Sequence, residues 1–240
     1  MTRLARLLTL LFAVALAQPA AAACRQALAM GLDVSGSVDE DEYRLQLDWL
    51  AAALTDPDVA RAILATPATP VRLLVYEWSG PTDQRLLAGW REITDAAALE
   101  AFADGLRTTR RRAASPSTAL GAALVTGATF LAEQRDCWTR TLDISGDGMS
   151  NTGPRPQDLD HVSELSEITV NALAIGRGEG GTLASASDLG KYFERLVIRG
   201  PGAFVEHAEG FPAYRAAMTR KLLRELGGVV VGALDRPGGQ

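Results

Sequence analysis

Apolar and polar positions follow two different periods along the chain, and each period predicts one kind of element. Short apolar runs between polar turns are typical of buried strands, and they occur at residues 27–30, 71–78, 138–145 and 168–175. Apolar residues three or four positions apart are typical of amphipathic helices, and they occur at residues 39–65, 95–106, 159–165, 183–193 and 211–226. Strands that alternate with helices predict an α/β fold.

Two local signals refine this pattern. The Thr-Asp-Pro sequence at residues 55–57 interrupts the longest helical segment and predicts two helices, because proline fits best in the first turn of a helix. A short polar turn at 79–83 joins the strand at 71–78 to a further apolar segment at 84–93. A turn this short joins antiparallel strands, so one edge strand should run against the others. A last edge strand is expected at 201–206.

The amino terminus has the features of a secretory signal peptide. Arg3 and Arg6 precede an apolar segment at residues 7–16, and small residues at 15–17 and 21–23 offer cleavage sites. The apolar segment is too short to span a membrane stably, and no later apolar run is long enough to do so. The protein is therefore expected to be exported, and hence periplasmic or secreted.

The rest of the chain is long enough for one sizeable core. We expect residues 1–23 to be the signal peptide, residues 24–226 to form a single domain and the Gly-rich residues 227–240 to form a flexible tail. There are no internal repeats and no linker that would divide the domain.

The charge balance argues against nucleic acid as a partner. Loss of Arg3 and Arg6 with the signal peptide changes the formal net charge from −5 to −7. An acidic chain is a poor match for a phosphate backbone, whereas it is compatible with divalent cations. Four arginines within residues 107–112 are a local exception, and we expect them to form a solvated loop.

The chain has two cysteines, Cys24 and Cys137. Each comes just before a predicted strand, and the first and fourth strands are neighbours in the doubly wound order. The two sulfur atoms could then meet at the amino-terminal edge of the sheet, and export favours a disulfide bond. The alternative is lipidation of Cys24, because the preceding Ala-Ala-Ala resembles a lipobox that lacks its leucine. The availability of Cys137 as a partner favours the disulfide.

The most informative polar residues follow the first predicted strand. Asp33, Ser35 and Ser37 stand at alternate positions after the apolar run, and acidic residues then open a helix. In open α/β sheets, ligands bind at the carboxyl ends of the strands. A carboxylate and two hydroxyls are hard oxygen donors, which suit magnesium, manganese or calcium better than zinc or copper. A polar turn with a helix N-cap is the simpler interpretation of the same residues.

This Asp-x-Ser-x-Ser sequence resembles the metal-ion-dependent adhesion site (MIDAS) of von Willebrand factor type A (vWA) domains. The resemblance implies two further ligands, a threonine just before a later helix and an aspartate after the fourth strand. Thr118 and Asp147 fit these places, with Gly146 inserted before Asp147. N-capping alone would also explain Thr118. Asp143 is the alternative second aspartate, but it lies inside a strand where a lone carboxylate is costly to bury, so Asp147 is favoured.

The resemblance also implies a fold and a function. The fold is a doubly wound, mostly parallel six-stranded sheet of order 3-2-1-4-5-6, with one antiparallel edge strand and helices on both faces. The function is that of a binding module that holds a divalent cation, Mg²⁺ in preference to Mn²⁺ or Ca²⁺, and binds a protein partner through an Asp or Glu carboxylate. The residues implied as metal ligands are Asp33, Ser35, Ser37, Thr118 and Asp147. The chain is also similar to a group of exported bacterial vWA-like proteins of unknown function.

The rival class is a hydrolase, either serine-based or metal-dependent. A serine hydrolase would need His161 or His207 beside its nucleophile, and no serine stands in the Gly-x-Ser-x-Gly sequence of a nucleophile elbow. A metal-dependent phosphoryl hydrolase would need more carboxylates around the ion. The Gly-rich segment at 178–181 lacks the Gly-Lys-Ser/Thr of a phosphate-binding loop. We therefore expect a binding protein and no enzyme.

Overall fold

The computed structural model describes residues 24–176 and 186–234. The predicted signal peptide, the Gly-rich segment at 178–181 and the last residues of the predicted tail (235–240) lie outside the described residues. The expectations for these segments remain predictions.

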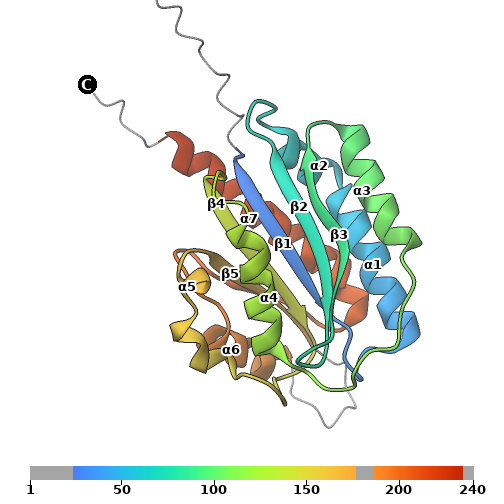
Figure 1. Ribbon diagram of the computed structural model, residues 1–240. Coiled ribbons are helices and arrows are strands. Elements are labelled where there is room, and N and C mark those ends of the chain that lie inside the picture. The colour runs from blue at the N-terminus through green and yellow to red at the C-terminus, as the bar shows by residue number, and fades with distance from the viewer. Residues whose placement is uncertain (1–23, 177–185, 235–240) are drawn as a thin grey trace, which may run out of the picture.

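A six-stranded sheet forms the centre of the domain, in the order β3-β2-β1-β4-β5-β6 (Figure 1). The strands are β1 (Gln26–Asp33), β2 (Val71–Trp78), β3 (Gln84–Ile93), β4 (Thr139–Gly146), β5 (Thr169–Ile175) and β6 (Val205–Ala208). Only the β2–β3 pair is antiparallel among these strands, and the other four pairs are parallel. The predicted strand order, the antiparallel edge strand and the α/β class are confirmed.

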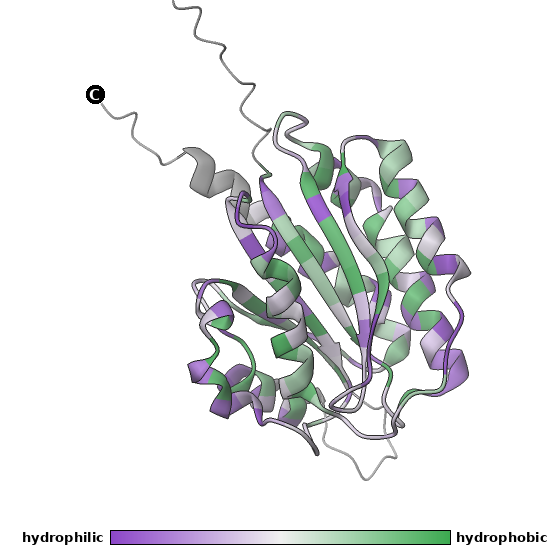
Figure 2. Cartoon of the chain, in the orientation of Figure 1, coloured by the Kyte–Doolittle hydropathy of each residue, from purple (hydrophilic) through white to green (hydrophobic). Residues whose placement is uncertain are grey.

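Helices cover both faces of the sheet, and each face has its own apolar core. One core includes residues of α1 (Glu40–Leu54), α2 (Pro57–Leu64), α3 (Ala96–Thr108) and α7 (Tyr214–Leu234). The other includes residues of α4 (Leu120–Ala132), α5 (Ser163–Ser166) and α6 (Ala186–Leu196). Figure 2 shows hydrophobic residues along the central strands and more hydrophilic ones toward the outer helices. Because β1 is buried on both faces, its sequence is almost continuously apolar rather than alternating.

The helix boundaries follow from capping residues. Asp39 caps α1, because its side chain accepts the backbone N–H of Glu42 while the Glu42 side chain accepts the N–H of Asp39. Asp56 caps α2, and Pro57 occupies the first helical position. The predicted division of residues 39–65 into two helices is therefore correct.

Several predicted boundaries are wrong. The segment at 159–165 is not one helix but a 3₁₀ helix, Pro156–His161, followed by the single turn α5, with Val162 extended between them. The last strand begins at Val205 rather than at 201, because Gly200 and Gly202 adopt positive φ and turn the chain there. Helix α7 continues to Leu234, since the glycines after Leu226 weaken a helix without breaking it as proline would.

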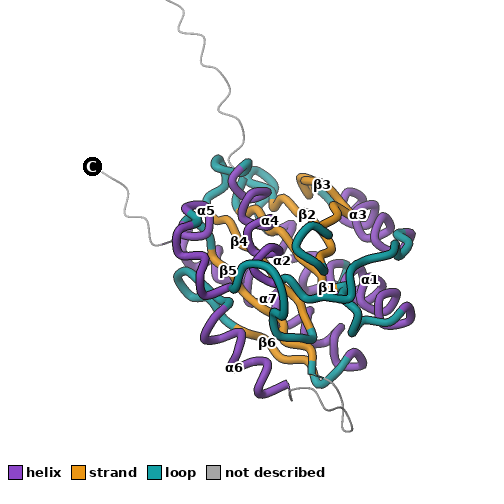
Figure 3. The backbone as a smooth tube through the Cα atoms, turned by 60° about the horizontal axis from the view of Figure 1, so that its bottom comes forward, coloured by secondary structure: helices purple, strands orange, loops and turns teal. Residues whose placement is uncertain are grey.

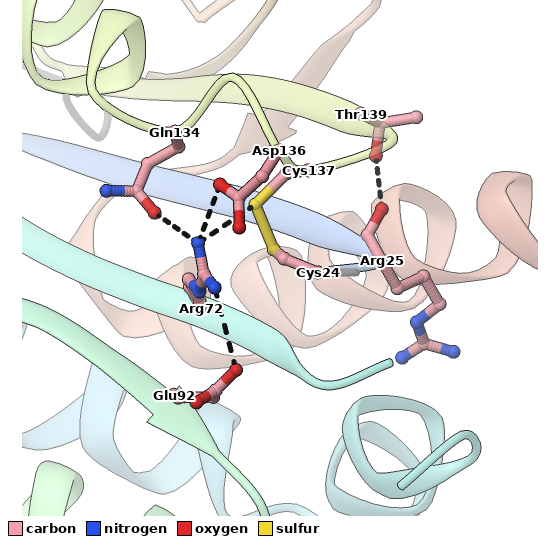
Figure 4. The surroundings of a disulfide bond; sticks show 8 residues. All are labelled: Cys24, Arg25, Arg72, Glu92, Gln134, Asp136, Cys137 and Thr139. Carbon is pink, nitrogen blue, oxygen red and sulfur yellow. Dashed lines mark hydrogen bonds and ion pairs between the residues drawn. A yellow bond between two sulfur atoms is a disulfide. The ribbon is translucent and has the colours of Figure 1, made fainter. Parts of the chain in front are cut away.

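Cys24 and Cys137 form a disulfide bond at the amino-terminal edge of the sheet, as predicted (Figure 4). The backbone pairing of β1 with β4 extends up to this bond, because Trp138 N–H donates to the carbonyl of Cys24 at 2.9 Å. Arg72 lies beside the bond and forms an ion pair of 2.9 Å with Asp136 (Figure 4). The disulfide therefore joins two adjacent strands at the end opposite to the polar motif.

None of the helices within residues 24–176 and 186–234 combines the length and the hydrophobicity required to cross a lipid bilayer.

Candidate functional site

The candidate site lies at the carboxyl ends of β1 and β4, which are parallel neighbours in the sheet. Asp33 is the last residue of β1, and Asp147 directly follows β4. Parallel pairing brings the two carboxylates to the same edge, where ligands bind in open α/β sheets. Figure 3 turns this edge of the molecule forward and shows loops gathered around it.

The five predicted site residues are linked by hydrogen bonds. The Asp33 carboxylate accepts the backbone N–H of Ser35 at 2.8 Å. The Ser35 and Ser37 hydroxyls are 3.2 Å apart, and Ser37 donates to Asp147 Oδ1 at 2.6 Å. Thr118 donates its hydroxyl to Ser35 Oγ at 3.3 Å. The structure thus brings together two carboxylates and three hydroxyls from three separate segments of the chain.

Backbone contacts hold Thr118 in this cluster. Its N–H donates to the Asn151 side chain at 2.9 Å, and its carbonyl accepts the N–H of Asn151 at 2.9 Å. The next residue, Ala119, donates its N–H to the carbonyl of Ser79 at 2.7 Å. Thr118 does not cap α4, because the N-cap is Ala119 and no side-chain hydrogen bond is made there. Its hydroxyl instead points to Ser35.

The cluster is largely withdrawn from solvent. Asp33 and Ser35 are each 1% exposed, Asp147 is 6% exposed and Ser37 is half-buried. Gly146, the residue inserted before Asp147, ends β4, and a Cβ atom there would lie only 3.3 Å from Asp33 Oδ2. A side chain at this position would crowd the carboxylate, and the glycine avoids this contact.

The donor set fits a hard divalent cation. Hydroxyl and carboxylate oxygens are the ligands that Mg²⁺ and Ca²⁺ prefer. Two carboxylates alone would not surround a cation with charged ligands. In the described part of the chain, no group of three or more His, Cys, Asp or Glu side chains is suited to hold a metal. Asp33 and Asp147 would supply the charge, and Ser35, Ser37 and Thr118 would supply neutral oxygens.

Asp143, the alternative second aspartate, has a different environment. Its side chain is fully buried beneath α7, where Lys221 Nζ lies 2.7 Å from Asp143 Oδ1. Burial raises the pKa of Asp143 to about 7, an effect that Lys221 opposes. Within the described residues, Asp147 rather than Asp143 makes the contact with Ser37.

Two supporting residues were missed or undervalued in the sequence. Gln46 is buried on α1 and donates its side-chain amide to the carbonyl of Asp33 at 3.1 Å, which fixes the end of β1. Its signal was a polar residue on the apolar face that also carries Tyr43 and Leu47. Asn151 accepts the N–H of Thr118 through its side-chain oxygen and so holds that residue in place.

The two histidines lie in ordinary structural positions. His161 Nδ1 is 2.9 Å from the carbonyl of Asp158 at the end of a 3₁₀ helix. His207 lies on the edge strand β6, where its ring packs against Gly190 of α6.

Gly121 provides a test of how the Thr118 loop is held. It lies in the first turn of α4, and an added Cβ would overlap the carbonyl of Pro154, in the segment that follows Asn151. We expect Gly121→Ala to reduce the free energy of unfolding by roughly 1–3 kcal/mol, because backbone must move to admit the methyl group. Gly105→Ala is the matched control, since a Cβ there meets nothing within 4 Å. Equal denaturant midpoints for the two variants would contradict this close packing.

The fold places the chain among the vWA-like domains. More particularly, the chain belongs to the family described as "Protein of unknown function (DUF1194)", whose model matches residues 23–230. A search of the curated proteins gave no match.

Solved structures with the same fold include the following three. A von Willebrand factor type A protein from Catenulispora acidiphila is 15% identical, with a TM-score of 0.57 over 86% of this chain and 43% of that one. Proximal thread matrix protein 1 from the mussel byssus, with a zinc-occupied MIDAS motif, is 14% identical, with a TM-score of 0.61 over 85% and 46%. The pilus adhesin SpaC from Lactobacillus rhamnosus GG is 12% identical, with a TM-score of 0.60 over 86% and 31%.

The present chain therefore spans less than half the length of each of these three proteins. At such low identity the similarity establishes the fold. The three proteins are described by a domain type, as a matrix protein and as an adhesin, and none of these descriptions names an enzymatic activity.

Proposed function

We propose that this protein is an exported binding module that holds a divalent cation, most readily Mg²⁺, at its candidate site. The ligands would be Asp33, Ser35, Ser37, Thr118 and Asp147. The observation that carries the proposal is the hydrogen-bonded convergence of these five side chains at one edge of the sheet. The MIDAS motif of the similarly folded mussel protein adds support.

The chemistry of the site favours binding over catalysis. A cation held by only two carboxylates keeps a strong affinity for one further anionic oxygen, which an Asp or Glu of a protein partner can supply. Neighbouring groups fix the orientation of the proposed ligands. The Ser35 N–H donates to Asp33, and the Ser37 hydroxyl donates to Asp147. Asn151 accepts the N–H of Thr118. No contact of the described histidines suggests a general base for a hydrolase.

Metal binding is tested by thermal unfolding. A ligand that binds only the folded state at 100 times its Kd should stabilise it by about 2.7 kcal/mol, which corresponds to a rise in Tm of roughly 5–10 °C for a domain of this size. Mg²⁺, Mn²⁺, Ca²⁺ and Zn²⁺ should be compared, since zinc occupies the motif of the mussel protein. Asp33→Ala should abolish the rise.

Asp41→Ala is the matched control, because Asp41 is an exposed carboxylate in the first turn of the neighbouring helix α1. It should retain the full metal-dependent shift. If the wild type shows neither a shift nor calorimetric binding at millimolar metal, the assignment of the site is wrong. A shift that persists unchanged in Asp33→Ala would place the metal elsewhere.

A further inference from the structure

The use of lysine in this chain is unusual. Of the 24 lysine and arginine residues, only Lys191 and Lys221 are lysines. Lys191 is exposed, whereas the Lys221 side chain is completely buried on the inner face of α7. Arginine is generally the better residue for a buried ion pair, because its guanidinium is weakly hydrated and always charged. A chain that uses arginine almost everywhere else has at this buried place a lysine, the type of basic side chain that can lose its proton and act as a nucleophile.

Lys221 lies between two carboxylates. Its Nζ is 2.7 Å from Asp143 Oδ1 on the central strand β4 and 2.6 Å from Glu225 Oε1, one turn further along α7. All three side chains are fully withdrawn from solvent. The amine and the carboxyl group of Asp143 are thus held at hydrogen-bond distance by the fold, and such fixed proximity favours a reaction between two groups.

The protonation states of the cluster favour a reaction between the Lys221 amine and the Asp143 carboxyl group. Two carboxylates and one ammonium leave an excess negative charge in a dry environment, and burial raises the pKa of Asp143 to about 7. Burial lowers the pKa of Lys221, but the two neighbouring carboxylates outweigh this effect, so that the pKa lies above its ordinary value. The neutral amine therefore arises by transfer of its proton to Asp143 across their 2.7 Å contact rather than by loss to solvent.

Neighbouring side chains hold the cluster in place. Asn171 on β5 donates its amide to Glu225 Oε1 at 2.8 Å, and the backbone N–H of Phe204 fixes the other end of that amide at 3.1 Å. The Phe204 ring lies 5.6 Å from Lys221 Nζ. The buried hydroxyl of Tyr214 lies close to the cluster: burial and then the charge of Asp143 raise its pKa, and a hydrogen bond with Ser145 opposes this rise.

We propose that Lys221 and Asp143 join after folding into an intramolecular amide bond, with Glu225 as the proton carrier. The neutral amine of Lys221 attacks the carbonyl carbon of the protonated Asp143, and Glu225 accepts the proton that the nitrogen loses. Glu225 then returns this proton to the departing hydroxyl. One C–N bond forms, one C–O bond breaks, and one water molecule leaves. No oxidant, cofactor or metal takes part, and Glu225 ends as it began.

The bond would tie α7 permanently to the central strand that leads to Asp147. A simple buried ion cluster is the alternative, and such clusters add little stability compared with apolar residues of similar volume. The amide replaces the buried charges of Lys221 and Asp143 by a neutral group. This gives a physical reason for a lysine where the rest of the chain would use arginine.

Mass spectrometry of the intact, folded and then disulfide-reduced full chain tests the proposal directly. The expected mass is lower by one water molecule than the sequence mass, and a branched peptide joining Asp143 to Lys221 should appear after tryptic digestion. The full sequence mass in folded wild-type protein would overturn the proposal. A water loss mapped to a succinimide at Asp147-Gly148, with separate Asp143 and Lys221 peptides, would overturn it equally.

Variants separate the roles of the three residues. Lys221→Arg and Glu225→Gln should both show the full mass, the first for lack of a nucleophile and the second for lack of the proton carrier. Lys191→Arg is the matched control, because Lys191 also faces an acid, Asp188 at 3.6 Å, but on the exposed surface of α6. It should retain the water loss completely. The amide at wild-type extent in Glu225→Gln would overturn the role of Glu225.

Discussion

Replacing Cys24 and Cys137 with serine is expected to lower the free energy of unfolding by about 4 to 5 kcal/mol. The bond closes a loop with a sequence separation of 113 residues, and in the chain-entropy model a loop of this length restricts the unfolded chain by that amount. Chemical denaturation of the double variant and of the wild type, with and without reductant, measures the difference. Reductant should lower the wild-type midpoint and leave the variant unchanged.

A nearby variant separates the covalent bond from its surroundings. Asp136→Asn removes one of the two exposed acidic partners of Arg72 beside the disulfide (Figure 4) but leaves the bond intact. Its cost should be no more than about 1 kcal/mol, as for other exposed ion pairs. Thiols of the purified protein that react with a labelling reagent before reduction would rule out the bond. A lipid on Cys24 would do the same.

The central strands and the first half of the site could be predicted from sequence because their signals are local. The apolar run that ends in Asp33 reads as a strand, and the polar positions that follow it read as a site, without knowledge of any distant residue. Site residues that lie on different segments of the chain were harder to predict. Thr118 and Asp147 were identified only through a family resemblance, since nothing in their local sequence requires them to meet Ser35 and Ser37.

The features that the sequence did not reveal depend on contacts between distant segments. Nothing near Asn151 indicates that it holds Thr118, and nothing near Asp143 indicates that Lys221 lies against it. The predicted boundaries of β6 and of the helical segment before β5 were wrong for a related reason. Short elements at the edge of a fold are determined by turns such as that at Gly200 and by packing, and they carry little periodicity of their own.

The surroundings of the site have charges of both signs. The acidic start of α1, with Asp39 as its cap, follows the site serines directly in the chain. Arg111 of the arginine loop lies over the Tyr43 ring of α1, 5.5 Å from its centroid. A cavity of about 130 Å³ is lined by Arg112, which is exposed, and by Val34, which is buried next to Asp33. The loop that we expected to be merely solvated thus comes close to the site, and a partner would meet acidic and basic groups together.

If the proposed function is correct, a chelator should eliminate binding of a protein partner, because the central contact between cation and carboxylate is lost. Salt should weaken binding more gradually, through the mixed charges around the site and mainly through the association rate. Pull-down from an envelope extract, with and without EDTA, identifies the partner. Titration of that partner at several salt concentrations then measures both effects.

Thr118→Ala should weaken this binding by at least about tenfold, or 1.4 kcal/mol, because it removes a hydroxyl that would face the proposed cation. Its effect on stability should be smaller, about 1 kcal/mol, since it deletes a single 3.3 Å hydrogen bond to Ser35. Ser117→Ala is the matched control: the Ser117 hydroxyl contacts Ser115 rather than the site and should leave affinity unchanged. A partner whose affinity is the same in EDTA and for Thr118→Ala would show that this vWA-like domain binds without the adhesion-site mechanism.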